Sequence, residues 1–366
     1  MKKIFIISSS LRGGGAERVS LNLYDYFSSN GEEVELIIFQ KDGAYLDLIE
    51  DQKITFLNKD SARSALPDLI KLIKANQESI FLSTKREINI VMGIAKFISM
   101  KSKVKLIFRE VNPLIYNNFF QRLISLIFVK FSYSFATHII ANSTGTKKNL
   151  LVNHICNQSK VSVIGNPVLS KEVIKSNPLE DQLIANNENI IICAGRLEKQ
   201  KNFRLAIDIL HSLNCMQINK KFKMIIYGMG SEREKLEGYI EKRGLINSVS
   251  MPGFSFDLLE DIKPGSLFLL TSSFEGFGNV IVEALFCGMP ICAKYSDGGV
   301  KDILENKDFV KVIDSPNDNP NDFLDAILKL SNINLTKSKK EEIRELSLNY
   351  SIESIGKKYL NTITTV

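Results

Sequence analysis

The sequence predicts an α/β protein with two domains, each built on a parallel, Rossmann-like sheet. Short apolar runs that suit buried strands alternate with helical patterns along the chain. The length of 366 residues allows two domains with separate cores. The pattern restarts after a polar stretch near residues 166–188. We therefore expect domains at residues 1–168 and 169–366 that face each other across a cleft, and a final helix that packs back on the first domain is compatible with this division.

The first half opens with a predicted strand at residues 3–8, a glycine-rich loop at residues 11–18 and a helix. The loop has neither the G-x-G-x-x-G nor the P-loop pattern, so it gives little support to a dinucleotide or Walker site. Gly14 and Gly15 do allow close backbone approach and leave N–H groups at the edge of a cleft. Further strands are expected at residues 34–39, 104–108, 138–143 and 161–164, and helices at residues 88–100 and 147–151.

Two polar side chains follow the strand at residues 104–108, namely Glu110 and Asn112. Ligands of open α/β sheets bind at the carboxyl ends of the strands. Both residues are therefore candidates for the cleft, and a solvated loop end is the alternative.

Residues 114–136 form an aromatic stretch with helical character, and several lysines precede it. Such a stretch can lie on an anionic membrane, or it can be a core helix on the sheet, and the two can hold on different faces. Residues 1–165 carry 22 Lys and Arg against 14 Asp and Glu, whereas the rest of the chain carries 25 against 27. A basic first half suggests an acidic partner surface, although solvated surface charge explains it equally well.

In the second half, a predicted strand at residues 189–194 leads into a turn at residues 195–202 and a helix from Phe203. Arg196 and Lys201 lie in this turn, beside the glycine that begins it. A diphosphate there would meet a planar guanidinium, an ammonium group and backbone N–H groups together. This combination predicts a phosphate-binding site.

The stretch at residues 267–291 is the most informative part of the chain. It predicts a buried strand, a glycine turn and a helix from Val280, and therefore free N–H groups at a helix start, where phosphate or sugar hydroxyls can bind. Glu275 lies in the turn and Glu283 eight residues on, which we interpret as two helical turns away on one face. The alternative is an ordinary strand–turn–helix in which Glu275 only favours the helix dipole.

The composition is that of a globular protein, with 44% hydrophobic and 24% charged residues. The five cysteines include no C-x-x-C pair, which favours a reducing, cytosolic setting without a zinc site or disulfide framework. The opening apolar run is too short for a signal peptide, and no apolar stretch is long enough to span a membrane.

Several segments resemble the family 4 retaining glycosyltransferases, which have the GT-B fold of two facing Rossmann-like domains. The resemblance covers most of the chain and is strongest over residues 189–304. The most specific signature is the E-x7-E spacing of Glu275 and Glu283. The segments that carry it are GGGAER (13–18), GRLEKQKN (195–202), YGMGSEREKLEGYI (227–240), PGF (252–254) and EGFGNVIVEALFCGMPI (275–291).

This resemblance implies roles for individual residues. Arg196 and Lys201 would hold the diphosphate of a sugar nucleotide and stabilise it as it leaves, without a metal ion. Glu275 would contact the donor sugar, and Glu283 the ribose hydroxyls. Phe254 would meet the base. The remaining implied donor-binding positions are Gly14, Gly15, Gly228, Gly230, Gly276, Phe277, Gly278 and Asn279.

The sequence departs from the family pattern on the acceptor side. Many members carry a histidine near the acceptor, and none of the three histidines here clearly takes that place. The segment REVNP (109–113) resembles instead the S-E-R-N segment of bacterial polysaccharide and lipid-linked oligosaccharide transferases, with Val111 where arginine is common. Glu110 and Asn112 thus become candidate acceptor residues of an acceptor-binding first domain.

The resulting hypothesis is a metal-independent, retaining glycosyltransferase without a cofactor, located at the inner face of a bacterial cell membrane. It would move a hexose or N-acetylhexosamine from a nucleotide sugar, with UDP as the favoured nucleotide, to a lipid-linked glycan in surface polysaccharide biosynthesis of the O-antigen or capsule type. The alternatives are a sugar-nucleotide epimerase or hydrolase on the same fold, and a non-catalytic glycan- or nucleotide-binding partner. A nucleic-acid-binding protein is disfavoured because no such motif accompanies the positive charge.

Overall fold

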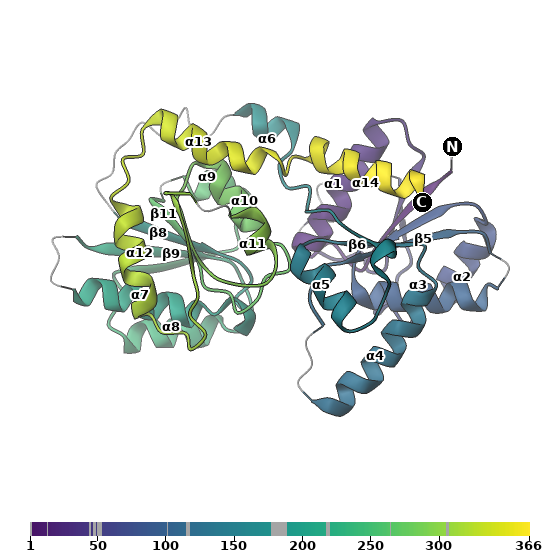
Figure 1. Ribbon diagram of the computed structural model, residues 1–366, viewed down its shortest axis with the longest axis horizontal. Helices are drawn as coiled ribbons and strands as arrows, with labels where there is room; N and C mark the ends of the chain where they lie inside the picture. Colours follow the sequence, from purple (N-terminus) through teal and green to yellow (C-terminus); the bar gives the residue numbers. More distant parts are fainter. Residues whose placement is uncertain are drawn as a thin grey trace. The chain divides into compact units, whose positions relative to one another are not determined.

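The computed structural model describes residues 2–12, 14–43, 45–46, 49, 53–100, 102–114, 118–176, 189–216, 220–263, 265–304 and 307–366. The chain forms two compact units (Figure 1). The first comprises Met1–Lys171 and Tyr350–Val366, and the second comprises Glu172–Asn349. The chain therefore passes from the first unit to the second and back again.

The first unit is built on a parallel sheet of seven strands in the order β3-β2-β1-β4-β5-β6-β7. The run Ile-Phe-Ile-Ile-Ser of β1 is buried on both faces, as expected for a central parallel strand. The strands are β1 (Ile4–Ser8), β2 (Val34–Ile38), β3 (Ile54–Phe56), β4 (Ile80–Ser83), β5 (Lys105–Glu110), β6 (His138–Ala141) and β7 (Val161–Val163).

Helices cover both faces of this sheet, so two separate hydrophobic clusters form. One cluster joins α1 and α14 to the sheet, and the other joins α2, α3, α4 and α5 to its opposite face. The helices are α1 (Gly15–Ser29), α2 (Leu66–Ala75), α3 (Arg86–Ile98), α4 (Phe119–Ser134), α5 (Thr144–Val152) and α14 (Ile352–Thr365), with the short η2 (Gln158–Lys160) before β7.

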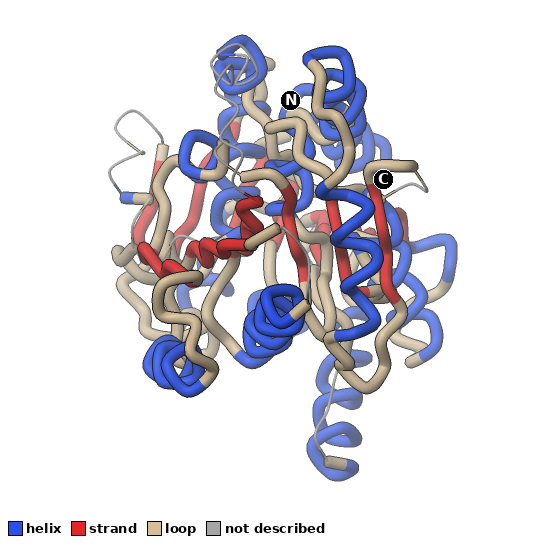
Figure 2. Tube along the Cα trace, turned by 90° about the vertical axis from the view of Figure 1, so that its left-hand side faces the viewer, coloured by secondary structure: helices blue, strands red, loops and turns tan. Residues whose placement is uncertain are grey.

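The second unit is built on a parallel sheet of six strands in the order β10-β9-β8-β11-β12-β13. Figure 2 shows the strands in red and the helices in blue along the Cα trace. The strands are β8 (Asn189–Ala194), β9 (Phe222–Tyr227), β10 (Val249–Gly253), β11 (Leu267–Leu270), β12 (Ile291–Lys294) and β13 (Val310–Ile313). The helices are α6 (Lys171–Ser176), η3 (Lys199–Lys201), α7 (Phe203–Cys215), α8 (Arg233–Lys242), α9 (Leu258–Asp261), α10 (Asn279–Phe286), α11 (Gly299–Ile303), α12 (Asn321–Ser331) and α13 (Lys337–Leu348).

The predicted α/β class with two Rossmann-like sheets is confirmed, and most predicted strands lie where the apolar runs placed them. One strand is longer than predicted, because β5 continues to Glu110 instead of ending at residue 108. Arg109 and Glu110 are both buried and pair with β6, so they belong to the sheet and not to a loop. Within the described residues, no helix is both long and apolar enough to cross a bilayer.

The aromatic stretch at residues 114–136 contains α4, whose two faces have different surroundings. Val129 and Tyr133 are buried against the sheet side of the unit. The opposite face exposes a row of large apolar side chains, namely Leu123, Ile124, Ile127, Phe128 and Phe131. Helix α4 is therefore both a core helix and the carrier of an apolar surface.

Candidate functional site

The carboxyl ends of β8 and β11 mark the centre of the candidate site in the second unit. These two strands are neighbours in the sheet, but β8 connects onward to β9 on one side and β11 to β12 on the other. The strand order therefore reverses between them, and open α/β sheets bind their ligands in the crevice at such a point. The loop after β8 carries Arg196 and Lys201, and the loop after β11 carries Glu275.

Lys201 and Glu275 meet directly at this point. The Lys201 Nζ lies 2.5 Å from Glu275 Oε1, and the side chains are 14% and 6% exposed. The Ser272 hydroxyl donates to the same carboxylate oxygen at 2.7 Å. The two residues were predicted separately from two motifs, and the structure brings them into one ion pair.

Hydrogen bonds to backbone carbonyl groups hold the two loops together around this ion pair. The Gln200 side-chain amide donates to the Phe274 carbonyl at 2.8 Å, and the Ser273 N–H donates to the Gln200 carbonyl at 2.8 Å. The Thr271 hydroxyl donates to the Lys201 carbonyl at 3.1 Å. Three hydrogen bonds thus fix one loop against the other, independently of the charges.

The turn before α7 positions Lys201, and the next residue, Asn202, has an unusual backbone conformation. Asn202 has a left-handed backbone with φ of 49°, and it ends η3 where α7 begins. Its side-chain amide donates to Asp318 Oδ2 at 3.0 Å, and Asp318 is also paired with Lys294 at the end of β12. Asparagine tolerates this conformation better than most residues, so the sequence can form the tight turn.

Glycines let four loops pack backbone against backbone at this edge of the sheet. A Cβ atom on Gly228 would lie 1.9 Å from the Gly195 carbonyl oxygen, and one on Gly230 would lie 2.4 Å from the Leu197 oxygen. A Cβ atom on Gly298 would lie 2.0 Å from the backbone carbonyl oxygen of Glu275. Only glycine fits at such distances, so these residues serve first to bring the site loops together.

Helix α10 begins after Glu275, which corrects one part of the sequence interpretation. The helix starts at Asn279, with Gly278 as its left-handed N-cap at φ of 94°. Glu275 therefore precedes the helix and does not share a helical face with Glu283. The prediction was wrong because the glycine turn extends over residues 276–278, so half of the eight-residue spacing is not helical. Glu283 is 4% exposed within α10.

Arg196 and Phe254 are the accessible members of the candidate site. The Arg196 side chain is exposed and forms no hydrogen bond or ion pair within the part of the chain that the structure describes. Phe254 is 36% exposed and packs edge to face on Phe256, with ring centroids 5.1 Å apart. An exposed guanidinium and an exposed aromatic pair are suited to phosphate and to a flat ring, respectively.

The first unit has a similar ion pair at the point where its own strand order reverses, between β1 and β4. Lys85 follows β4 and pairs with Glu17 in the first turn of α1, while its Nζ also donates to Ser9 Oγ at 3.0 Å. Gly14 is the N-cap of α1 and Gly15 its first residue, whereas Gly13 lies outside the described residues. Sequence reasoning missed Lys85 because it did not recognise β4 as a strand.

Glu110 lies at the buried end of β5 and is fully partnered. Arg86 Nη2 lies 2.9 Å from Glu110 Oε1, and the Tyr133 hydroxyl donates to Oε2 at 2.5 Å. Burial and then the charge of Glu110 raise the pKa of Tyr133 well above its ordinary value, so Tyr133 stays a neutral donor. Asn112 is exposed, and its carbonyl accepts a hydrogen bond of 2.5 Å from Arg86. The two candidate acceptor residues are thus joined through Arg86.

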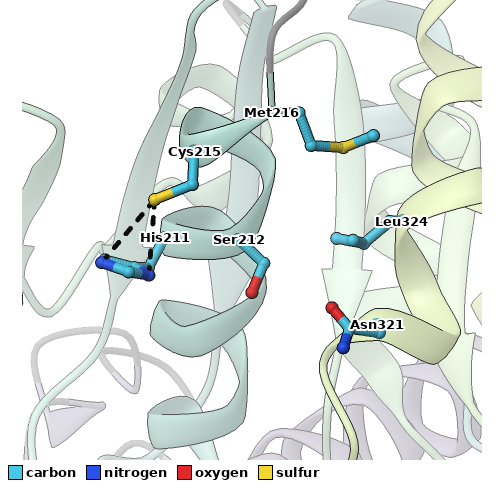
Figure 3. Close-up of a pocket in the computed structure, with 6 residues that line it drawn as sticks. All are labelled: His211, Ser212, Cys215, Met216, Asn321 and Leu324. Carbon is cyan, nitrogen blue, oxygen red and sulfur yellow. Dashed lines mark hydrogen bonds between the residues drawn. The ribbon is translucent and has the colours of Figure 1, made fainter.

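A pocket of about 360 Å³ in the second unit lies elsewhere (Figure 3). Its lining comes from the C-terminal part of α7 and from α12, and includes the neighbouring pair His211 and Cys215. Helix α7 starts at the carboxyl edge of the sheet and runs back, so its C-terminal end lies at the amino edge. Neither Lys201 nor Glu275 lines this pocket. Among the described residues, no group of three or more His, Cys, Asp or Glu side chains could hold a metal ion.

Comparison with known proteins assigns the chain to a class of enzyme. The model of the family Glycosyl transferases group 1 matches residues 176–346. A Campylobacter jejuni N-acetylgalactosamine-N,N'-diacetylbacillosaminyl-diphospho-undecaprenol 4-alpha-N-acetylgalactosaminyltransferase is 26% identical over 332 residues, which cover 87% of this chain and 88% of that protein. The Escherichia coli lipopolysaccharide 1,6-galactosyltransferase is 30% identical over 174 residues, 46% of each chain.

Solved structures support the same architecture. The crystal structure of Anabaena Alr3699/HepE in complex with UDP and glucose has a TM-score of 0.80 and 21% identity, with full coverage of both chains. These comparisons fit the transferase hypothesis and not the epimerase, hydrolase or binding-partner alternatives. The chain is therefore a glycosyltransferase with the GT-B fold, and its match to the group 1 glycosyl transferase model lies within the second unit.

Proposed function

We propose that this glycosyltransferase moves a hexose or N-acetylhexosamine from a UDP-sugar to a lipid-linked glycan, with retention of the anomeric configuration and without a metal ion. The observation that carries the donor side is the ion pair of Lys201 and Glu275 where the strand order of the second sheet reverses. A sugar diphosphate offers negative charge and hydroxyl groups, and an adjacent cation and carboxylate suit both. Names of similar proteins support UDP and a diphospho-undecaprenol acceptor.

The proposed roles follow the charge that develops in the reaction. As the bond between the anomeric carbon of the donor sugar and the diphosphate oxygen breaks, negative charge collects on the leaving diphosphate. Lys201 turns from Glu275 to the diphosphate, and the exposed Arg196 joins it, so two cations supply the stabilisation that a metal ion would otherwise give. Glu275 binds hydroxyl groups of the donor sugar, while Glu283 binds the ribose and Phe254 the base.

The remaining proposed contacts are made by backbone and by the first unit. The N–H groups of the turn before α10 lie against the sugar and phosphates, at the positive end of the helix dipole. These positions are Gly276, Phe277, Gly278 and Asn279, and Gly228 with Gly230 are the proposed positions in the loop after β9. Gly14 and Gly15 are the proposed donor contacts of the first unit. Asn112 handles the acceptor, and the buried Glu110 holds Arg86, which binds the Asn112 carbonyl.

A thermal-shift screen tests the donor proposal first. A ligand that binds only the native state raises the melting temperature according to its occupancy. We expect UDP and at least one of UDP-glucose, UDP-galactose, UDP-N-acetylglucosamine and UDP-N-acetylgalactosamine to raise it in buffer with EDTA. The same conjugate should then transfer its sugar to a diphospho-undecaprenol-linked saccharide, and the anomeric configuration of the product is read by NMR. A shift that appears only when magnesium or manganese is added contradicts metal independence.

We also propose that the enzyme is peripheral on the inner face of the cell membrane and binds it through an α3–α4 surface in the first unit. This surface consists of exposed apolar side chains of 42–83% exposure at Phe97, Ile98, Met100, Leu123, Ile124, Ile127, Phe128 and Phe131. Phe97 stacks edge to face on Phe131, with centroids 5.3 Å apart, which makes the two helices one surface. The exposed Arg122, Lys130 and Lys103 flank it, and Lys101 lies outside the described residues. Apolar side chains flanked by cations suit an anionic bilayer.

Replacing Ile127 with glutamate is expected to weaken vesicle binding by about tenfold, because it removes a buried apolar side chain from the bilayer and adds repulsion. Co-sedimentation with vesicles of phosphatidylglycerol and phosphatidylcholine measures the effect. Ile246→Glu is a matched control, since Ile246 is 63% exposed in the second unit against 59% for Ile127. If both variants and a Lys103→Glu, Lys105→Glu protein bind the vesicles as the wild type does, the proposed surface is contradicted.

A further inference from the structure

The two carboxylate oxygens of Glu275 have different surroundings. Oε1 accepts from Lys201 Nζ at 2.5 Å and from Ser272 Oγ at 2.7 Å. Oε2 accepts no hydrogen bond from the part of the chain that the structure describes. Both protein donors thus act on one oxygen, and the other is left for a hydroxyl group of a ligand.

Ser272 is held in place by its neighbours along the chain. It is 2% exposed and directly follows Thr271, whose hydroxyl donates to the Lys201 carbonyl. On the other side, the Ser273 N–H donates to the Gln200 carbonyl. The Ser272 hydroxyl is therefore presented to Glu275 by a backbone that is fixed on both sides, and it needs no rearrangement when a ligand binds.

Lys201 differs from Ser272 in what it does when the donor arrives. Under the proposed function, its ammonium group moves to the diphosphate, and the contact with Glu275 Oε1 weakens. Ser272 is then the protein donor that remains on this oxygen. A carboxylate held by one short, charge-assisted hydrogen bond keeps its direction, whereas one without it can rotate away from the sugar.

We propose that Ser272 is a positioning residue that keeps Glu275 Oε2 directed at the donor sugar after Lys201 has engaged the diphosphate. This inference rests on the proposed donor function and adds to it the residue through which Glu275 recognises the sugar. Ser272 touches neither sugar nor phosphate in this scheme. Ser272 therefore affects only the affinity for the sugar part of the donor, and it does so by orienting Glu275.

Calorimetry with UDP and with the four UDP-sugars named above tests the proposal, because the ratio of their dissociation constants measures the contribution of the sugar. In Ser272→Ala we expect the affinity for UDP to stay within about twofold, and the affinity for the preferred UDP-sugar to fall about tenfold, as for loss of a hydrogen bond to a charged group. Ser273→Ala is the matched control, since Ser273 is exposed and keeps its backbone contact. It should bind as the wild type does.

A double-mutant cycle separates positioning from a merely structural role. Once Glu275 is alanine, adding Ser272→Ala should cause no further loss of UDP-sugar affinity, because the group that it positions is gone. Ser272→Cys, which keeps the size and a weak donor, should lose less than the alanine variant and serves if that variant does not fold.

Four results are decisive. A parallel fall in UDP and UDP-sugar affinity, or a loss that persists without Glu275, overturns the positioning role. Ser272→Ala and Ser272→Cys proteins that both bind like the wild type also overturn it. Wild-type protein that gains no affinity from any of the four sugars contradicts the proposed donor function itself.

Discussion

Replacing Lys201 with alanine is expected to lower the turnover number by about 10²–10³-fold, the usual effect of removing one fixed donor to a developing negative charge. The loss should fall on turnover, because the leaving diphosphate gains most of its charge in the transition state. Initial rates at saturating UDP-sugar and acceptor measure it. Lys199→Ala is the matched control: Lys199 lies in the same short η3 helix, is exposed, and makes the same change in net charge.

Stability must be followed beside activity, since Glu275 is 6% exposed and loses its cation in this variant. A buried carboxylate without its partner destabilises the fold. The double variant Lys201→Ala, Glu275→Ala removes both charges, so it should regain melting temperature and remain inactive. Should folded Lys201→Ala protein turn over at a rate close to that of the wild type, Lys201 has no role at the diphosphate.

Replacing Gly299 with alanine is expected to reduce donor affinity and turnover together, by about 100-fold, because a misplacement of about 1 Å in a site has effects of this size. A Cβ atom on Gly299 would lie 1.6 Å from the Phe277 carbonyl oxygen. No side chain can yield there, so the turn at residues 276–278 must move. That turn carries the N–H groups proposed to bind the donor. Kinetic constants and UDP affinity measure the effect.

Gly238→Ala is the control for this variant. A Cβ atom on Gly238 meets nothing within 4 Å, and the residue lies inside α8. Alanine there should raise stability by about 0.5–1 kcal/mol and leave activity unchanged. If Gly299→Ala binds UDP and turns over as Gly238→Ala does, the turn before α10 is not part of the donor site.

The sequence predicts the fold well where local pattern decides it. The run Asn189–Ala194 is a strand with the predicted bounds, because a short apolar run followed by glycine is too short for a typical helix and suits a buried strand. Lys201 and Glu275 were each placed at a strand end, and their motifs implied one ligand. That the two strands are neighbours is a property of the strand order, which pattern alone does not specify.

Other features were missed for related reasons. The strand Ile80–Ser83 is only four residues long, and without it Lys85 cannot be placed opposite Glu17. Glu110 was predicted as an accessible residue, but it pairs with Arg86 and Tyr133 from two separate helices. The donation of Ser272 to one oxygen of Glu275 depends on differences below an ångström. Such contacts follow from packing, not from periodicity.

Helix α14 closes the first unit, although it follows the whole second unit in the chain. Ile355, Tyr359 and Ile363 are buried in the core on β1 and α1, and the Tyr359 hydroxyl accepts a 3.0 Å hydrogen bond from the buried Arg109. During synthesis, the second unit can therefore complete its core while the first still exposes the face that α14 will cover. We therefore expect the first unit to complete its core after the second, although domains usually fold from the N-terminus during synthesis.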